Sequence, residues 1–219
     1  METPTESWNR VIVLANGHIE DYQALSPWLL PGARVLCADG GARHADPLGL
    51  VPDLLLGDFD SLPETELARW QARGVGIRRV PREKDQTDTH LAMDLAVSRG
   101  ARHILLLGAT GERLDHTWAN VLLLPRFVEQ GVRVQVVNER NVLTVTRDRE
   151  TVVGQPGDFV SLLPLTPEVS GVTLRGFKYP LEEATLRWGE SLGVSNELLG
   201  TEGEVRLRQG WLAVIRARD

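Results

Sequence analysis

Several residue types and patterns that mark whole classes of proteins are scarce or absent in this sequence. A single cysteine among 219 residues excludes a disulfide within the chain and a zinc site built from several cysteines. Cys37 lies in the apolar run 35–38, which predicts a small buried side chain and fits a reducing cytoplasm. No apolar run reaches the ~18 residues of a membrane-spanning helix, so no membrane partner is expected.

An excess of positive charge is lacking as well. The formal net charge is −6 at pH 7, whereas proteins that bind nucleic acids generally present a basic face. We therefore expect no general nucleic-acid binding. The sequence also lacks the P-loop pattern G-x-x-x-x-G-K-[ST] and the dinucleotide pattern G-x-G-x-x-G. Binding of a nucleotide would then depend on metal ions or local cations that screen its charge.

What the first part of the chain does contain is an alternation of short apolar runs with helix-like segments. Most runs are continuous, which is typical of parallel strands covered on both faces. Helices are expected from Ser61, where Ser61 and Glu64 have the spacing of a capping box, from Asp88, and from Asp115 to near Pro125, which should kink or end the helix. This alternation predicts a doubly wound, Rossmann-like α/β domain at residues 1–138. Its strands are expected at residues 11–15, 34–38, 53–57, 76–80, 103–108 and 132–137.

The pattern changes after residue 138. Helical periodicity fades, and short strands separated by turn residues follow, which predicts a smaller all-β sandwich domain at residues 139–219. The runs 205–208 and 211–215 flank Gln209-Gly210, a combination typical of a tight hairpin.

Acidic residues follow the ends of several predicted strands. Asp39 follows the second strand, Asp58 and Asp60 follow the third, and Asp88 comes after the fourth. Ligands bind beyond the carboxyl ends of parallel strands, so these acids should converge at one edge of the sheet. Turns and helix caps also favour aspartate, so any one of them alone would mean little. Together they predict a nest for one or two Mg²⁺ ions, because gathered carboxylates repel one another until a cation binds them.

Other polar residues lie in the same loops. Arg113, after the fifth strand, is the cation best suited to grip phosphate oxygens in a bidentate manner. Gly40 and Gly41 allow a ligand to approach the backbone closely. His116 has either a structural role or a substrate contact, and the sequence leaves both open. The other histidines have no metal-ligand spacing and are expected to be incidental: His18, His44, His90 and His103.

In combination, these motifs resemble the thiamine pyrophosphokinase family. The similarity is carried by Ala38-Asp39-Gly40-Gly41, Gly57-Asp58-Phe59-Asp60-Ser61, Asp85 with Thr87-Asp88, and Arg113-x-Asp115-His116, which occur in the family's order and spacing. In the second half, Gly176–Leu181 and Ser195-Asn196 resemble the family's second-domain signatures. The resemblance thus extends from Asn16 to Asn196.

The resemblance implies a homodimeric enzyme that transfers the diphosphate of Mg²⁺-ATP to the hydroxyl of thiamine, with active sites at the subunit interface. It implies that Asp39, Asp58, Asp60 and Asp88 bind the metal, and that Asp58, Asp60, Asp88 and Arg113 are catalytic. The expected nucleotide contacts are Asn16, Gly17, Asp39, Gly40, Gly41, Thr87 and Arg113. The expected thiamine contacts are Lys84, Asp115, His116, Ser195 and Asn196.

Two other functions remain as alternatives. One is a pyrophosphokinase for a different hydroxymethyl heterocycle, such as a dihydropterin, and the other is a non-catalytic sensor of nucleotide or thiamine. Retention of all four acids argues against the sensor. Three residues depart from the family pattern. Glu112 stands for a glycine, which predicts a different shape of the loop before Arg113, and Tyr179 stands for a tryptophan and keeps an aromatic face. Gly193 stands for a serine, which bears on substrate fit more than on reaction class.

Overall fold

The structure is a computed structural model in which residues 8–218 are described. Residues 1–7 and 219, which the sequence analysis assigns to the ends of the two domains, lie outside the described residues. The chain forms two compact units, which we describe one at a time. Unit 1 holds the residues up to 123 and 129–139, and unit 2 holds residues 124–128 and those from 140 onward. Within residues 8–218, no helix combines the length and the apolar character that crossing a membrane requires.

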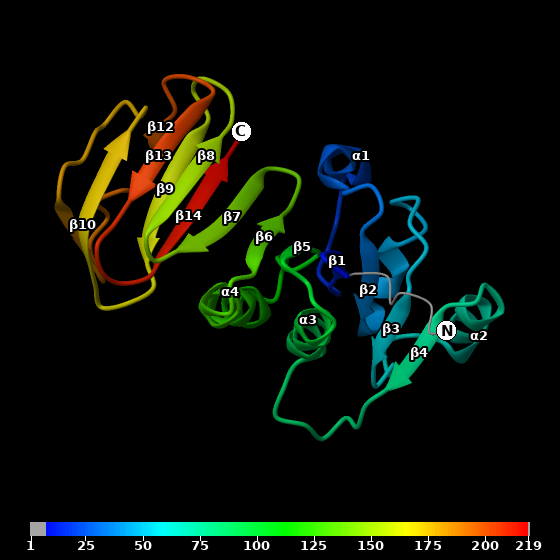
Figure 1. Ribbon diagram of the computed structural model, residues 1–219. Coiled ribbons are helices and arrows are strands. Elements are labelled where there is room, and N and C mark those ends of the chain that lie inside the picture. Colours follow the sequence, from blue (N-terminus) through cyan, green and yellow to red (C-terminus); the bar gives the residue numbers. More distant parts are fainter. Residues whose placement is uncertain (1–7, 219) are drawn as a thin grey trace, which may run out of the picture. The chain divides into compact units, whose positions relative to one another are not determined.

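Unit 1 is built on a parallel β-sheet with the strand order β6-β5-β1-β2-β3-β4 (Figure 1). Its central strands are buried along almost their whole length, as parallel strands covered on both faces must be. Each strand predicted for the first domain is present, with ends within one residue of the prediction. They are β1 (Arg10–Leu14), β2 (Arg34–Ala38), β3 (Leu54–Gly57), β4 (Gly76–Arg79), β5 (His103–Leu107) and β6 (Arg133–Val137).

The direction in which strands are added to this sheet changes between β1 and β5. From β1 to β4 each new strand lies on one side of its predecessor, whereas β5 pairs with the other side of β1 and β6 follows it there. At such a switch point the loops after the two central strands diverge and leave a crevice at the carboxyl ends of the strands. The loops after β1 and β5 are therefore positioned to frame a ligand site.

The helices of unit 1 connect these strands. α3 (Asp88–Ser98) packs on β1, β2 and β3, and the side chain of its N-cap Thr87 accepts a hydrogen bond from the backbone N–H of His90. The remaining helical segments are α1 (Tyr22–Leu25), the short 3-10 helices η1 (Ser26–Trp28) and η2 (Asp39–His44), α2 (Glu64–Ala72) and α4 (Leu114–Glu129), whose residues 124–128 belong to unit 2.

The capping box predicted at Ser61 is wrong. α2 begins at Glu64 with Pro63 as its N-cap residue, and the hydroxyl of Ser61 donates a hydrogen bond to the Asp39 carboxylate instead. The bond that the hydroxyl donates to a charged carboxylate is stronger than the one that a capping serine accepts from a backbone N–H, which explains why the side chain is held at the neighbouring strand end.

Pro125 was expected either to kink the helix or to end it, and it does not end it. α4 contains Pro125 and continues to Glu129. The neighbouring side chains of Leu124 and Phe127 are fully buried, and this packing outweighs the single helical hydrogen bond that proline removes.

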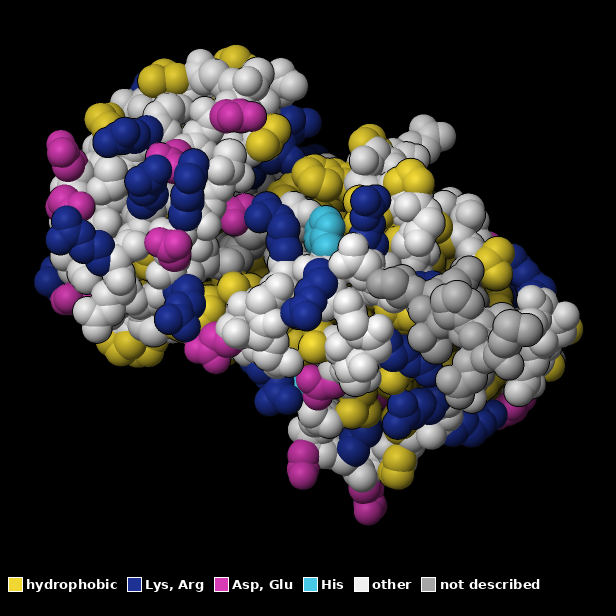
Figure 2. Space-filling model, in the orientation of Figure 1, with side chains coloured by type: hydrophobic (Ala, Val, Ile, Leu, Met, Phe, Trp, Pro, Cys, Tyr) yellow, Lys and Arg dark blue, Asp and Glu magenta, His cyan; other side chains and the backbone are white. Residues whose placement is uncertain are grey.

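Unit 2 consists of two antiparallel sheets, with the strand orders β12-β9-β14-β7 and β11-β10-β13-β8. Both sheets contribute buried side chains to one apolar core, for example Val160 and Val214 from the first and Val172 and Val205 from the second. On the face that Figure 2 presents, the outer surface of this unit carries Lys and Arg interspersed with Asp and Glu. The strands are β7 (Asn141–Thr146), β8 (Arg149–Val153), β9 (Phe159–Pro164), β10 (Glu168–Arg175), β11 (Ala184–Arg187), β12 (Asn196–Glu197), β13 (Glu202–Arg206) and β14 (Leu212–Ala217).

The hairpin predicted around Gln209-Gly210 is wrong. β13 pairs with β8 and β10, whereas β14 pairs with β7 and β9 in the other sheet. Val205 and Leu207 on one side of the turn and Leu212 on the other are all buried in the same core. The chain crosses between the sheets here because the apolar residues of both segments then face each other, a choice that local turn chemistry does not reveal.

Candidate active site

Three of the four acids predicted to bind metal come together at the carboxyl ends of β2 and β3. Among the described residues, Asp39, Asp58 and Asp60 each offer a carboxylate oxygen, and these oxygens lie within 4.8 Å of one another. We call these three residues the acid cluster. The adjacent strands bring their loops together, and Gly57 permits a close approach, because a Cβ atom there would lie 2.9 Å from the Asp39 Cα. The predicted convergence of acids is thus a consequence of the strand pairing.

The backbone of the acid cluster adopts uncommon conformations. Asp39 has a φ of 46° and Phe59 a φ of 60°, and the latter is a marked outlier for a bulky side chain. Phe59 is buried, while Asp58 and Asp60 on either side of it remain accessible. The bend therefore anchors the loop in the core and leaves both carboxylates at the sheet edge. Strain of this kind persists where the surrounding structure enforces it, as at many functional sites.

The polar atoms of the acid cluster are incompletely satisfied. Oδ2 of Asp39 accepts the hydrogen bond from Ser61, but the buried Oδ1 has no hydrogen-bond partner among the described residues. A buried carboxylate oxygen without a donor is costly unless a cation binds it. Carboxylate oxygens are the ligands that Mg²⁺ prefers, so the residues present fit a divalent cation.

The fourth acid, Asp88, is joined to the cluster through a lysine. The Nζ atom of Lys84 lies 3.3 Å from Oδ1 of Asp88 and 3.8 Å from Oδ2 of Asp58, and it donates a 3.0 Å hydrogen bond to the Pro81 carbonyl. Burial raises the pKa of Asp88 above its ordinary value, Lys84 opposes this shift, and the negative charges of Asp39 and Asp58 add to it. The ammonium group of Lys84 thus lies between Asp88 and Asp58, where the sequence analysis expected a metal ion.

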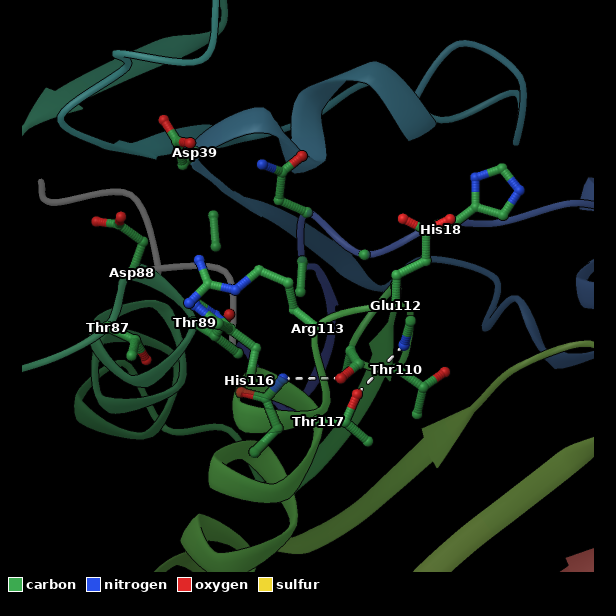
Figure 3. A pocket seen from close by; sticks show the side chains of 18 of the residues that line it. His18, Asp39, Thr87, Asp88, Thr89, Thr110, Glu112, Arg113, His116 and Thr117 are labelled. Atoms are coloured by element: carbon green, nitrogen blue, oxygen red, sulfur yellow. Dashed lines mark hydrogen bonds between the residues drawn. The ribbon is translucent and has the colours of Figure 1, made fainter.

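A cavity of about 510 Å³ opens at the switch point, beyond the ends of β1, β2 and β5. Asp39 and Asp88 lie at one end of it, and His18 and Glu112 lie at the other (Figure 3). Its volume is in the range of sites that hold small molecules and cofactors. The predicted site residues that line it are Asn16, Gly17, Asp39, Lys84, Thr87, Asp88, Arg113 and His116.

Of the predicted site residues in unit 1, five are not part of this lining: Gly40, Gly41, Asp58, Asp60 and Asp115. The two glycines act through close packing, because a Cβ at Gly41 would lie 2.1 Å from the Leu14 carbonyl oxygen and one at Gly40 would lie 2.4 Å from Oδ1 of Asn16. They let η2 start directly against the end of β1. Their direct contact with a nucleotide stays a prediction.

The loop after β1, residues 15–18, forms one wall of the cavity, and we call it the rim loop. The N–H of Gly17 donates a 2.7 Å hydrogen bond to the Gly108 carbonyl, and a Cβ at Gly17 would lie 2.3 Å from that same oxygen. From η2, Arg43 donates to the Asn16 carbonyl, and Nε2 of His44 lies 2.8 Å from the Gly17 carbonyl. The rim loop is therefore held on two sides.

Two of the histidines expected to be incidental belong to this site. His18 lines the cavity, and the buried His44 holds the rim loop. Metal-ligand spacing could not reveal them, because one is found here as a cavity-lining side chain and the other as a partner of a backbone carbonyl. Burial lowers the pKa of His44 to about 4, so its ring is neutral at physiological pH.

Arg113 and Asp115 form an ion pair at the start of α4. Nε of Arg113 lies 3.2 Å from Oδ1 of Asp115, and the second guanidinium nitrogen bonds the other carboxylate oxygen. This hydrogen bonding raises the pKa of Arg113 and lowers that of Asp115. Both side chains are largely exposed, at 70% and 64%, so the pair can exchange partners at little cost.

Ser195 and Asn196 lie in unit 2. Asn196 is buried, and its amide is used by the chain itself: Oδ1 accepts from the Tyr179 N–H at 3.0 Å and Nδ2 donates to the Tyr179 carbonyl at 2.7 Å. Ser195 is exposed, and its N–H donates to Oγ of Ser161. Gly193 has a φ of 96°, which explains a glycine where the family often has serine. Asn196 thus supports the loop that carries Tyr179, and a thiamine contact of either residue stays a prediction.

Two family models match this chain. The model described as "Thiamin pyrophosphokinase, catalytic domain" matches residues 31–136, and the model described as "Thiamin pyrophosphokinase, vitamin B1 binding domain" matches residues 141–212. The chain belongs to the thiamin pyrophosphokinase family. The resemblance found in the sequence motifs is thereby confirmed.

Relatives within the thiamin pyrophosphokinase family cover most of the chain. Thiamine pyrophosphokinase of Bacillus subtilis is 32% identical over 173 residues, which are 78% of this chain and 81% of that protein. A crystal structure of thiamine pyrophosphokinase from Bacillus subtilis superposes with a TM-score of 0.86 at 28% identity, over 96% of this chain and 99% of the other. The structure of thiamin pyrophosphokinase from Geobacillus thermodenitrificans has a TM-score of 0.83 at 33% identity, over 96% and 98%.

In this member of the thiamin pyrophosphokinase family, the cavity also contains cations that the sequence analysis missed. Arg43 lies on η2, four residues after Asp39, and Arg82 lies two residues before Lys84. Arg82 also approaches Asp60, with 3.5 Å between the charged atoms. Their proximity in sequence to predicted site residues was the available signal.

Two polar residues of α4 that the sequence analysis also missed support the loop after β5. Nδ2 of Asn120 donates a 2.8 Å hydrogen bond to the Ala109 carbonyl, and Oγ1 of Thr117 accepts one of 3.2 Å from the Gly111 N–H (Figure 3). α4 therefore holds the second wall of the cavity as η2 holds the first.

Proposed function

We propose that this chain transfers the diphosphate group of ATP to the hydroxyl of thiamine, with a requirement for Mg²⁺, and releases thiamine diphosphate and AMP. The observation that carries this proposal is the acid cluster, whose Asp39 lines one end of the cavity and has an unpartnered buried Oδ1, in a cavity that is also lined by three arginines and a lysine. Membership of the thiamin pyrophosphokinase family identifies the reaction class.

Transfer of a phosphoryl-type group requires mainly positioning and neutralisation of charge. Mg²⁺ held by Asp39, Asp58 and Asp60 would supply Lewis-acid neutralisation of phosphate oxygens when it is bound. The chain's own cations contribute to the same end, because Arg43, Arg82, Lys84 and Arg113 all line the cavity. Arg113 would exchange its exposed partner Asp115 for a phosphate oxygen.

In the transfer, the thiamine oxygen forms a bond to the β-phosphorus of ATP, and the bond from this phosphorus to the oxygen bridging the α-phosphate breaks. The hydroxyl proton must go to a base. Asp60 and Asp88 are both candidates for this base, and a metal ligand is a poor base. Asp88 lies outside the acid cluster and lines the cavity, which favours it as the acceptor.

A homodimer is the expected assembly, and one surface feature supports it. Leu114, Trp118 and Leu122 follow one another at four-residue spacing along α4 and are exposed by 76%, 57% and 54%. An apolar stripe of this kind on one side of a helix is a common feature of protein interfaces. Sedimentation velocity at several protein concentrations would test for the dimer. A cytoplasmic location stays a prediction.

The reaction is tested by incubating the purified protein with Mg²⁺, ATP and thiamine and separating the products by chromatography. We expect equal amounts of AMP and thiamine diphosphate, and no products after chelation of the metal. Formation of ADP would indicate attack at the γ-phosphorus and a different reaction class. Binding of thiamine without turnover would favour the sensor, and turnover of a hydroxymethyl dihydropterin in place of thiamine would favour the other pyrophosphokinase.

A further inference from the structure

His44 is a buried polar residue that links two segments of unit 1 far from it in sequence. Its side chain belongs to η2, and only 2% of the residue is exposed. Nδ1 lies 2.9 Å from the hydroxyl of Tyr22 on α1, and Nε2 lies 2.8 Å from the carbonyl oxygen of Gly17 in the rim loop. The ring therefore bridges α1 and the rim loop from the inside of the unit.

The two partners determine which ring nitrogen carries the proton. A carbonyl oxygen only accepts hydrogen bonds, so Nε2 of His44 must donate to Gly17 at 2.8 Å. Nε of Arg43 also points at Nε2, but at 3.5 Å this contact is much the weaker of the two. In the neutral ring Nδ1 then accepts from the Tyr22 hydroxyl. Burial and the nearby Arg43 and His18 favour the neutral ring, whereas the Gly17 carbonyl and Glu139 act in the opposite sense, and burial dominates. One neutral tautomer is thus selected by the packing.

η2 connects this hydrogen bond to the opposite end of the cavity. The helix begins at Asp39, a member of the acid cluster, and ends at His44. Its glycines contact the end of β1 so closely that a Cβ at Gly41 would lie 2.1 Å from the Leu14 carbonyl oxygen. The same short helix therefore holds Asp39 at one end of the cavity (Figure 3) and the rim loop through its last residue.

We propose that His44 is a positioning residue for the nucleotide: its Nε2–H fixes the Gly17 carbonyl and so sets the position of the rim loop relative to Asp39. A polyphosphate chain that reaches from the rim loop to the acid cluster requires this spacing. The ring touches neither substrate nor metal, because the cavity lining contains Arg43 and His18 but not His44. This inference rests on the proposed use of ATP.

The first test examines the hydrogen bond in the wild-type protein. Nitrogen-15 NMR of the histidine rings should show His44 as the neutral Nε2–H tautomer with no titration between pH 5.5 and 8. A ring that carries its proton on Nδ1, or that titrates near the ordinary pKa of histidine, would overturn the proposal. This measurement is independent of whether any variant folds.

The second test compares variants by equilibrium binding of a non-hydrolysable ATP analogue and, separately, of Mn²⁺ as a probe of the acid cluster. His44→Leu, which lacks the donor, should weaken binding of the analogue about tenfold, which corresponds to about 1.4 kcal/mol. Affinity for Mn²⁺ alone should change less than about twofold. In turnover, KM for ATP should rise and KM for thiamine should remain unchanged.

Two matched variants separate positioning from general packing. His44→Gln retains an N–H donor and should recover most of the nucleotide affinity. Tyr22→Phe removes only the hydroxyl on the far side of the ring and should bind the analogue nearly as the wild type does. If His44→Leu does not fold, the proposal is still tested by the tautomer that NMR finds for His44 and by the nucleotide affinities of His44→Gln and Tyr22→Phe.

Three results would contradict the positioning role. They are wild-type nucleotide affinity in His44→Leu, an equal loss of nucleotide and Mn²⁺ affinity in that variant, and a loss in Tyr22→Phe as large as in His44→Leu. If the wild-type protein itself binds no ATP analogue, the proposed use of ATP is wrong, and the positioning role of His44 is wrong with it.

Discussion

The rim loop and, through Asp39, the acid cluster border the same cavity, but their polar atoms are satisfied to very different degrees. In the acid cluster, three carboxylates crowd within 4.8 Å and Oδ1 of Asp39 is buried without a partner among the described residues. In the rim loop, the N–H and the carbonyl of Gly17 are both hydrogen-bonded, and Arg43 bonds the Asn16 carbonyl. One region needs a ligand to complete it, whereas the other is complete as it stands.

This difference indicates how the two regions should respond to change. In the proposed function the acid cluster acts through its charge, so altering a charge should change metal binding and catalysis with little effect on folding. The rim loop derives its function from shape, so altering a contact or a backbone position should change stability and nucleotide affinity together.

The largest effect is expected from Asp58→Asn in the acid cluster. The substitution preserves shape but removes a charge that metal binding requires, so turnover should fall on the order of a thousandfold. The unfolding transition should remain near that of the wild type. Steady-state kinetics and urea denaturation measure the two quantities. Asp148→Asn, in the exposed turn between β7 and β8, is the matched control and should retain activity. Normal turnover in Asp58→Asn would remove that residue from the mechanism.

The next effect concerns the rim loop and pH. Because the pKa of His44 is about 4 in the folded protein and ~6.5 in an unfolded chain, the unfolded state binds the additional proton between these values. The stability associated with the neutral ring is complete above pH 6.5 and is lost as the pH falls toward 4, by up to about 3 kcal/mol. Urea denaturation from pH 7.5 to 4.5 should show a steeper decline for the wild type than for His44→Gln. Parallel curves would mean that His44 is not buried as a neutral ring.

A smaller loss should follow from Gly17→Ala in the rim loop. The added Cβ would lie 2.3 Å from the Gly108 carbonyl oxygen and 2.4 Å from that of Thr110, backbone atoms that cannot swing aside. We expect a loss of about 1–3 kcal/mol in the free energy of unfolding, together with weaker nucleotide binding. Gly111→Ala is the control, since its Cβ would lie 3.3 Å from the nearest atom, the His18 nitrogen. Equal stability of the two variants would show that the rim loop is more adaptable than its contacts indicate.

The smallest effect is expected from the lysine beside the acid cluster. Lys84→Met removes a positive charge 3.8 Å from Asp58 and should raise the affinity for Mn²⁺ about fivefold, as measured by calorimetry. The Lys84 side chain is 16% exposed, whereas that of Arg82 is 80% exposed, and solvent screens the latter. Arg82→Met should therefore raise the affinity less. A lower affinity in Lys84→Met would mean that the ammonium group orders the acids instead of competing with metal.

Much of the fold was predictable, because parallel strands and their order along the chain leave a local signal. Continuous apolar runs located β1 to β6 to within one residue, and the clustering of Asp39, Asp58 and Asp60 followed from the rule that ligands bind at strand ends. Asp88 was also predicted to face this edge. Its lysine partner was not predicted, since Lys84 was assigned to substrate and nothing in the sequence indicates that it bridges two aspartates.

The errors share one cause, which is that local patterns compete with distant partners. Ser61 has the spacing of a capping residue, yet its hydroxyl bonds Asp39, 22 residues away. The turn at Gln209-Gly210 has hairpin chemistry, yet its flanking strands enter different sheets because both bury apolar side chains in one core. In each case a tertiary contact outweighed a weaker local preference.

By itself the sequence determined the strands of unit 1, the acids at their ends and, through its motifs, the family. Strand formation depends on side chains that are adjacent along the chain, and motifs are linear by definition, so both can be read without coordinates. The tertiary structure alone decided which polar groups meet: Ser61 with Asp39, Lys84 with Asp58, and His44 with Gly17, 27 residues away. Hydroxyl, ammonium and imidazole groups interact with whatever acceptor or opposite charge packing brings near them, and packing is a property of the whole fold.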